Sequence, residues 1–278
     1  MIQWFDILMK AVLYGSRRLD RTGVGTVALF AEVLRFDNSD AFPAVTTKRL
    51  AFNQCAAEMA CFIQGLHDLD SFHRAGCTVW DGNGTDPRWV DSGGPKFGGD
   101  LGRIYGVQWR YWKSVGQSGE TVQVDQLKNL VEGLKREPHS RRHIVTAWNP
   151  GEMGAVCLPP CPVLFQCYVA RNRMDMAVYQ RSCDLFLGLP FDVAGYALLQ
   201  RLIAHEAGLS SGKLTFFLGD AHVYLNHLEQ VAEVCRRKPL EPPFLVWQAG
   251  SSLFNFEPSH VRLGGYTSHG PVNAPLNV

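Results

Sequence analysis

Long apolar runs are missing from this sequence, and so are several other marks of particular protein classes. No stretch of about 18 apolar residues occurs, so we expect no membrane-spanning helix. The start, MIQWFDILMK, lacks the apolar core of a signal peptide. The formal net charge of +1 gives no sign of general polyanion binding, so we expect no DNA binding. Any phosphate recognition must therefore come from a few arginines in one pocket.

Paired cysteines are also absent, because none of the eight cysteines forms a CxxC motif. Secreted chains held by disulfides are short and dense in cysteine, and a chain of 278 residues with eight cysteines is neither. We therefore expect most of the thiols to be small buried hydrophobes in a reduced, cytoplasmic protein that holds no metal.

Repeats, low-complexity tracts and clear linkers are lacking too, so we expect a single domain over residues 1–278. The hydrophobic share of 46% is enough for a substantial core. One irregular stretch, residues 82–102, is rich in Gly, Asp and Pro and predicts a long surface loop. A loop of this length is often functional, and an insertion without a chemical role is the alternative.

Periodicity predicts both helices and strands. Apolar spacing indicates helices over residues 4–15, 53–66 and 192–207, the last with Asp192 placed as its N-cap. Strand-like runs occupy residues 26–36, 143–148, 163–170, 174–180 and 213–218. Because strands and helices do not alternate regularly, a doubly wound parallel sheet is excluded and a mixed α+β fold is expected.

The first chemically suggestive motif is a cysteine that follows two prolines, in Leu158-Pro159-Pro160-Cys161-Pro162. The strand-like run VLFQCYV comes directly after it, so Cys161 is expected on a tightly set turn. Most cysteines in such settings are buried structural thiols, and the spacing alone does not distinguish that role from a nucleophile.

The second motif spans residues 179–192, where Arg181, Ser182 and Asp184 interrupt a run that otherwise resembles core. Buried charges are costly unless they are paired or bound to a ligand. An Arg–Ser pair suits an oxyanion such as phosphate. An internal salt bridge between Arg181 and Asp184 is the alternative, and the residues alone leave both open.

Motifs along nearly the whole chain resemble the thymidylate synthase family. They are DRTGVGT (20–26), FPAVTTKR (42–49), the Glu58 helix ending in FIQG, VWD (79–81), YGVQWR (105–110), SRRHIV (140–145), PPC (159–161), QRSCDLFLGLPF (180–191) and GDAHVY (219–224). The resemblance implies an α+β fold, a mixed sheet packed with helices, and a homodimer formed through the sheet with shared active sites. It also implies a pyrimidine deoxynucleotide monophosphate as substrate and 5,10-methylenetetrahydrofolate as cosubstrate.

The resemblance assigns roles residue by residue. It makes Cys161 the nucleophile that adds to C6 of the pyrimidine, with Glu58, Tyr105 and Asp192 as the other catalytic groups. A nearby cation is expected to lower the pKa of such a thiol. The implied nucleotide ligands are Arg21, Arg181 and Ser182 for the phosphate, His222 and Tyr224 for the sugar hydroxyl, Gln180, and the pair Arg141 and Arg142, which would reach into the partner's site. The implied folate contacts are Trp80, Asp184, Gly188 and Lys48.

The clearest departure from the family is Asp192, because thymidylate synthases usually have Asn there. Cytosine inverts the hydrogen-bonding pattern of uracil at N3 and at the C4 substituent. A protonated carboxyl group can donate to N3 and accept from the 4-amino group, so Asp192 resembles the deoxycytidylate hydroxymethylases and favours dCMP over dUMP. A plain helix cap, which Asn and Asp provide equally, is the alternative.

Three further departures concern the fate of the transferred carbon. Pro162, Asn83 and Ala51 stand where many thymidylate synthases have His, Trp and His, and their loss could admit water, although each could also be drift. Capture by water would give 5-hydroxymethyl-dCMP, which we favour. Trp80 and the tail APLNV (274–278) instead favour hydride transfer, which would give 5-methyl-dCMP and dihydrofolate.

The remaining alternatives are a dUMP-specific synthase or hydroxymethylase and, from a different class, a silent homologue that acts as a binding protein. Retention of Cys161, Glu58, Arg181 and Tyr105 argues against the silent homologue. Enzymes of the hydroxymethylase kind often serve viruses that modify their DNA, which would place the protein in the host cytoplasm.

Overall fold

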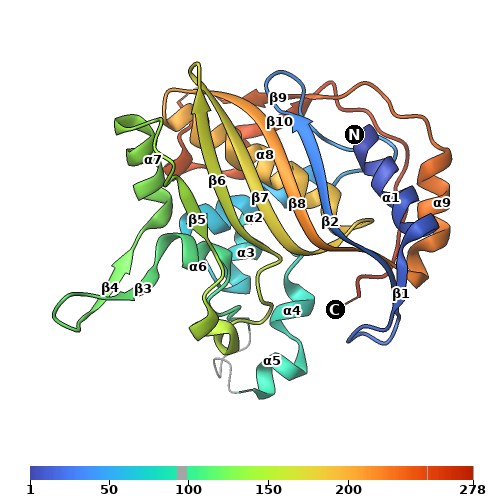
Figure 1. Ribbon diagram of the computed structural model, residues 1–278, viewed down its shortest axis with the longest axis horizontal. Helices are drawn as coiled ribbons and strands as arrows, with labels where there is room; N and C mark the ends of the chain where they lie inside the picture. The colour runs from blue at the N-terminus through green and yellow to red at the C-terminus, as the bar shows by residue number, and fades with distance from the viewer. Residues whose placement is uncertain (93–98, 249, 278) are drawn as a thin grey trace.

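A six-stranded mixed sheet forms the centre of the computed structural model, which describes residues 1–92, 99–248 and 250–277 (Figure 1). In spatial order its strands are β1 (Ser16–Arg18), β2 (Thr26–Asp37), β8 (Ser210–Tyr224), β7 (Arg173–Asp184), β6 (Pro162–Ala170) and β5 (Ile144–Thr146). Strands β7 and β8 run parallel, and every other neighbouring pair is antiparallel. The mixed sheet and its helices confirm the expected α+β class.

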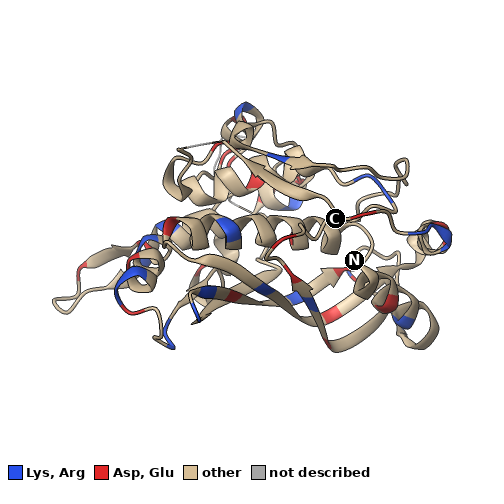
Figure 2. Ribbon diagram, turned by 90° about the horizontal axis from the view of Figure 1, so that it is seen from above, with Lys and Arg blue, Asp and Glu red and all other residues tan. Residues whose placement is uncertain are grey.

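The helices surround this sheet unevenly. They are α1 (Ile2–Tyr14), α2 (Phe52–Gln64), α3 (Leu69–Ala75), α4 (Asp81–Gly84), α5 (Pro87–Asp91), α6 (Tyr105–Arg110), α7 (Gln126–Arg136), α8 (Gly188–Glu206) and α9 (Leu228–Arg236). Two small hairpins add β3 (Trp112–Val115) with β4 (Thr121–Val124), and β9 (Phe244–Trp247) with β10 (Val261–Gly264). Figure 2 shows the sheet as one layer with the long helices on one side of it.

Alternating side chains explain why the sheet has one buried face. Along β7 the residues Met174, Met176 and Val178 are buried, whereas Tyr179 is exposed. Helix α8 packs across β7 and β8 and is buried nearly all round, as its continuous apolar sequence requires. The aromatic rings of Phe165, Tyr196 and Phe216 meet edge to face between the sheet and α8, and they anchor the core there.

The predicted helices and strands are confirmed in kind, with strands β7 and β8 longer than expected. Two expectations were wrong. Asp192 is not an N-cap, because α8 begins at Gly188 and the N–H groups of Phe186 and Leu187 donate to the Asp184 carboxylate, at 2.8 and 3.2 Å. The stretch 82–102 is not an open loop throughout, because α5 and most of α4 lie within it; residues 93–98 lie outside the described part of the chain.

Candidate active site

One cavity of about 1210 Å³ collects most of the residues that the sequence singles out. It lies where the end of β7, the end of β8 and the start of α8 meet α2, α4 and the turn before β2. Thirteen predicted site residues line it: Arg21, Glu58, Trp80, Tyr105, Cys161, Gln180, Arg181, Ser182, Asp184, Gly188, Asp192, His222 and Tyr224. Lys48, Arg141 and Arg142 do not.

Cys161 stands on a turn that Arg181 clamps. The Arg181 Nε donates to the Pro160 carbonyl at 2.8 Å and its Nη2 to the Pro159 carbonyl at 2.7 Å. The Arg181 backbone N–H also donates to the Cys161 carbonyl at 2.8 Å. The predicted alternative, an ion pair between Arg181 and Asp184, does not occur within the described residues. Arg181 therefore holds the thiol in place and lines the cavity next to it.

The Cys161 thiol is protonated at rest. Burial raises its pKa above the ordinary value, and the Asp192 carboxyl adds to that effect, whereas Arg181, Arg21 and the Tyr105 hydroxyl lower it. The nearby cations do lower this pKa as expected, but the cost of burying a thiolate exceeds their attraction, so the net shift is upward. The thiol must lose its proton when it attacks.

Two half-buried carboxyl groups, Glu58 and Asp192, also line the cavity. Burial raises the pKa of Glu58 to about 8, although Trp80 Nε1 donates to its Oε1 at 2.8 Å. Burial likewise raises the pKa of Asp192 to about 7, although Gln180 Nε2 donates to its Oδ2 at 2.7 Å. Near neutral pH each group can therefore hold a proton and donate a hydrogen bond, which an ordinary carboxylate cannot do.

Tyr105 joins the cysteine to the aromatic wall of the cavity. Its hydroxyl oxygen accepts the Cys161 backbone N–H at 2.7 Å, and its ring packs between Phe62 and Trp80. Burial raises its pKa well above the usual range. Tyr105 is therefore a neutral hydroxyl that can relay a proton through water but does not ionise by itself.

The turn before β2 carries Arg21 into the cavity lining, and Asp20 builds that turn. The Asp20 carboxylate accepts from the backbone N–H groups of Thr22 and Gly25, at 3.1 and 2.9 Å. Gly25 has a φ of +81°, a conformation that favours glycine. These contacts explain the spacing of the DRTGVGT motif. They do not involve the Arg21 side chain, which is therefore available to a ligand.

Strand β8 presents Asp220, His222 and Tyr224 on one face, because alternate residues of a strand point the same way. The His222 Nδ1 lies 2.9 Å from Asp220 Oδ1, and Arg18 Nη1 donates to Asp220 Oδ2 at 2.6 Å. The hydrogen bond to Asp220 leaves His222 Nε2 available to a ligand. Sequence reasoning missed Asp220 and Arg18, although the two-residue spacing of aspartate and histidine could have indicated the first.

Lys48 lies beneath the cavity and not in its lining. Its Nζ donates to the Phe186 carbonyl at 2.7 Å and lies 4.3 Å from the centre of the Phe186 ring. Burial lowers its pKa to about 8. Arg141 and Arg142 are exposed just before β5, on a segment that does not contribute to this cavity.

Other lining residues were not assigned a role by sequence reasoning. Trp148 presents its ring to the Arg181 guanidinium at 5.4 Å. Leu276 and Asn277 bring the C-terminal tail to the cavity, where Asn277 Nδ2 donates to Asn226 Oδ1 at 3.1 Å. The tail APLNV drew attention in the sequence through the family resemblance, whereas no local pattern marks Trp148, which only the fold brings to the cavity.

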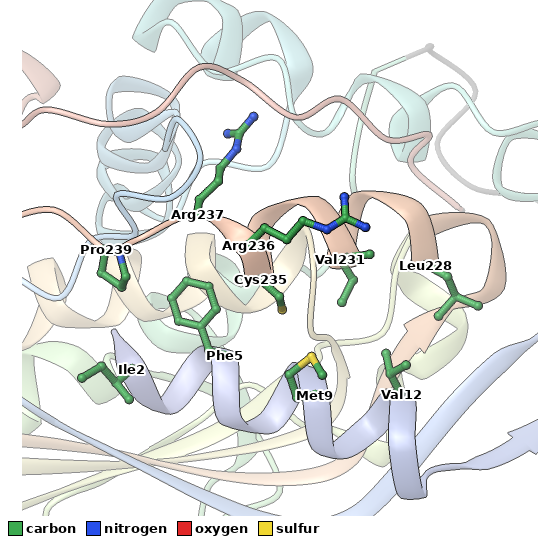
Figure 3. A pocket seen from close by; sticks show the side chains of 11 residues that line it. Ile2, Phe5, Met9, Val12, Leu228, Val231, Cys235, Arg236, Arg237 and Pro239 are labelled. Atoms are coloured by element: carbon green, nitrogen blue, oxygen red, sulfur yellow. The ribbon is translucent and has the colours of Figure 1, made fainter.

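A second, apolar cavity of about 610 Å³ lies between α1 and α9. Figure 3 shows Phe5 and Met9 on α1 facing Cys235 on α9, with Val12 and Leu228 at one end. None of the predicted site residues lines this α1–α9 groove.

Within the described residues, no group of three or more His, Cys, Asp or Glu side chains could hold a metal ion. No helix in the described part of the chain is long and apolar enough to cross a membrane.

Comparison with known protein families gives a match to the family described as Thymidylate synthase over residues 2–278. The match agrees with the cavity, where a cysteine, two carboxyl groups with raised pKa values and several arginines meet. The chain therefore belongs to the thymidylate synthase family, whose members transfer a one-carbon unit from a methylenetetrahydrofolate cosubstrate to C5 of a pyrimidine nucleotide.

Proposed function

We propose that this protein acts on dCMP and releases 5-hydroxymethyl-dCMP. The observation that carries the proposal is the half-buried Asp192 carboxyl, which lines the same cavity as Cys161 and whose pKa is raised by desolvation to about 7. Cytosine needs a donor at N3 and an acceptor for its 4-amino group. A protonated carboxyl supplies both, one from each oxygen, whereas uracil would meet the wrong pattern at both positions.

Gln180 supports this assignment because it engages only one oxygen of Asp192. Its Nε2 donates to Oδ2, which leaves Oδ1 to carry the proton for N3 and a second lone pair of Oδ2 to accept from the 4-amino group. The Gln180 Oε1 atom is buried and has no hydrogen-bond partner in the described protein. Asp192 is thus held at one oxygen and open at the other, as a group that reads a base edge requires.

Arg21, Arg181 and Ser182 provide the phosphate end of the site in this proposal. They line the cavity together, and Arg181 lies beside the cysteine through its contacts with Pro159 and Pro160. Arginine suits a phosphate dianion because its planar donors pair with two oxygens at once. His222 and Tyr224 would then meet the sugar, since they line the cavity on β8.

The chemistry follows from the cysteine. The Cys161 thiol loses its proton, its Sγ bonds to C6 of the pyrimidine, and the displaced electrons move toward N3, where the Asp192 proton stabilises them. C5 thereby becomes nucleophilic. The cosubstrate 5,10-methylenetetrahydrofolate supplies the one-carbon unit at this point. The C5 proton then leaves through water held by the neutral Tyr105 hydroxyl. The bond between the transferred carbon and the folate nitrogen breaks, tetrahydrofolate departs with that electron pair, and an exocyclic methylene remains on the ring.

We further propose that the working unit is a homodimer formed through the sheet. On the face of the sheet away from α8, Val33, Phe217 and Tyr179 lie side by side in register and are 38–41% exposed. An exposed apolar row of this kind favours a protein partner. Arg141 and Arg142 are exposed beside the edge strand β5, where a partner's nucleotide phosphate could reach them.

The second candidate is a dCMP C5-methyltransferase. Trp80 in the cavity wall and the tail residues Leu276 and Asn277 favour it, because they would shield the methylene from water. The two candidates differ only in what captures that methylene.

One assay tests the proposal. The protein is incubated with dCMP or with dUMP and the folate cosubstrate, and the nucleotide product is weighed. We expect dCMP to gain one CH2O unit. A gain of one CH2 unit would support the methyltransferase, and turnover of dUMP in preference to dCMP would overturn the cytosine assignment.

A further inference from the structure

Asn83 carries an almost buried side-chain amide that has no hydrogen-bond partner among the residues that the structure describes. Its side chain is 9% exposed and lines the large cavity. The backbone N–H of Asn83 donates to the Trp80 carbonyl at 3.0 Å, but its side-chain amide makes no hydrogen bond within the described residues. Its amide atoms are also not among the buried atoms enclosed by protein without a partner. The amide therefore opens onto the cavity.

The backbone around Asn83 is tightly held. A Cβ on the next residue, Gly84, would lie 2.9 Å from side-chain atoms of both Leu101 and Leu69. This turn of α4 therefore packs closely against the core. Trp80, the residue before α4, is tied by its indole N–H to Glu58. Asn83 thus sits on a rigid wall that it shares with Trp80 and Glu58.

A nearly buried amide without a partner costs about 1–3 kcal/mol unless water or a ligand satisfies it. An amide both donates and accepts, so it can hold one water molecule and direct a lone pair of that water. We propose that Asn83 positions the water molecule that captures the exocyclic methylene and so decides the product. This inference rests on the proposed function and names the residue that controls its last step.

The step balances as follows. The water oxygen bonds to the methylene carbon, and the π electrons of the exocyclic double bond return to C5. The C6–Sγ bond then breaks, Cys161 leaves as a thiolate, and the C5–C6 double bond is restored. One proton of the water is released to solvent. No oxidant or reductant takes part, and tetrahydrofolate is left unoxidised.

The test separates the formation of the methylene from its capture. Tritium release from C5-tritiated nucleotide reports every step up to the methylene. Mass spectrometry, in the presence of a fixed concentration of 2-mercaptoethanol, reports how the methylene divides between water, the added thiol and hydride. We expect Asn83→Leu to release tritium close to the parental rate and to lower the share captured by water at least about tenfold, because a nucleophile without positioning loses that much or more.

Matched variants control for general damage. Asn83→Ser keeps a donor and an acceptor and is expected to lie between the parent and Asn83→Leu. Asn129→Leu makes the same substitution on the exposed face of α7 and should leave the division of products unchanged.

Three outcomes would overturn the inference: a parent that yields only the methyl product, the same division of products in Asn83→Leu as in the parent, or a raised KM for the folate with no change in that division. The last result would make Asn83 a pteridine contact. If tritium leaves dUMP but not dCMP, the cytosine assignment fails while the division of dUMP products still tests Asn83. Release from neither pyrimidine overturns both.

Discussion

The two cavities described above differ in the kind of side chain that lines them. The large cavity brings together Cys161, Glu58, Asp192 and Tyr105, and burial raises the pKa of every one of them. The α1–α9 groove is lined mostly by apolar side chains, and Arg236 and Arg237 are its charged residues. Burying ionisable groups costs stability, so a site that gathers four of them is retained for chemistry. The groove carries no comparable signature.

Two cysteines sharpen this contrast, because Cys161 lines the large cavity and Cys235 lines the groove, and both are partly buried. Burial raises the pKa of each thiol. Cys161 also has Arg181, Arg21 and the Tyr105 hydroxyl around it, whereas burial alone acts on Cys235. Neighbouring groups, and not exposure, distinguish the candidate nucleophile from a structural thiol.

The largest expected effect is on Cys161. Cys161→Ala or Cys161→Ser should abolish turnover, because a hydroxyl at neutral pH cannot replace a thiolate, and losing a nucleophile costs several orders of magnitude, about 10³-fold or more. The fold should remain intact, as checked by thermal unfolding. Retention of rates within about tenfold of the parent would rule out covalent catalysis by this cysteine.

The second largest effect is expected from complementation between two inactive subunits. If Arg141 reaches the partner's nucleotide, Arg141→Ala and Cys161→Ala subunits should each be impaired alone. A heterodimer of the two contains one site with both residues and should regain part of the parental rate. Activity is measured after mixing differently tagged subunits. No recovery in heterodimers that are shown to form would count against shared sites.

Replacing Asp192, the group proposed to read the base, should change the ratio of kcat/KM for dCMP to kcat/KM for dUMP by roughly 10²-fold. In Asp192→Asn, two inverted hydrogen bonds, each worth about 1–3 kcal/mol, should lower kcat/KM for dCMP and raise it for dUMP. Asp192 lies inside α8 and not at its cap, so helix stability gives no alternative reason for the residue. An unchanged ratio of kcat/KM values would remove Asp192 from base recognition.

Stability should depend on pH through the same carboxyl group. Burial raises the folded pKa of Asp192 from 3.8 to about 7, so the folded protein binds a proton that the unfolded chain has lost. The contribution of this bound proton to the free energy of unfolding is complete below pH 3.8. It is lost as pH rises to about 7, by at most about 1.4 kcal/mol per pH unit.

Asp192→Asn should remove this contribution. Its stability relative to the parent should rise steadily across that pH window, as measured by urea unfolding at several pH values. Asp91→Asn, on the exposed surface of α5, is the matched control and should follow the parent. A constant difference between Asp192→Asn and the parent from pH 4 to pH 8 would show that the carboxyl is not protonated in the folded state.

The smallest effect is expected in the groove. Cys235→Ser should leave kcat and KM at parental values and reduce stability by less than about 1 kcal/mol, because the thiol is only partly buried and does not line the large cavity. Loss of turnover in this variant, with stability preserved, would show that the two cavities are coupled.

Sequence reasoning reached the cysteine, the arginines and the β8 residues because each lies in a short motif whose spacing suits one purpose. It found Asp192 through a single departure from the family pattern, but the helix-cap alternative could be dismissed only when α8 was seen to begin at Gly188. It grouped Lys48 with the folate contacts, whereas the lysine lies beneath the cavity against Phe186. It passed over Arg18 and Asp220, which are separated by about 200 residues and meet only through the pairing of β1, β2 and β8.

The sequence by itself determined the fold class, the family and the identity of the reactive groups, because apolar periodicity and the chemistry of side chains are local properties of the chain. Tertiary structure alone decided the state of those groups. The proton on Cys161, the raised pKa values of Glu58 and Asp192 and the open amide of Asn83 all depend on burial and on neighbours that are distant in sequence. The cost of removing a charge from water is set by the whole surrounding fold, and no local pattern contains it.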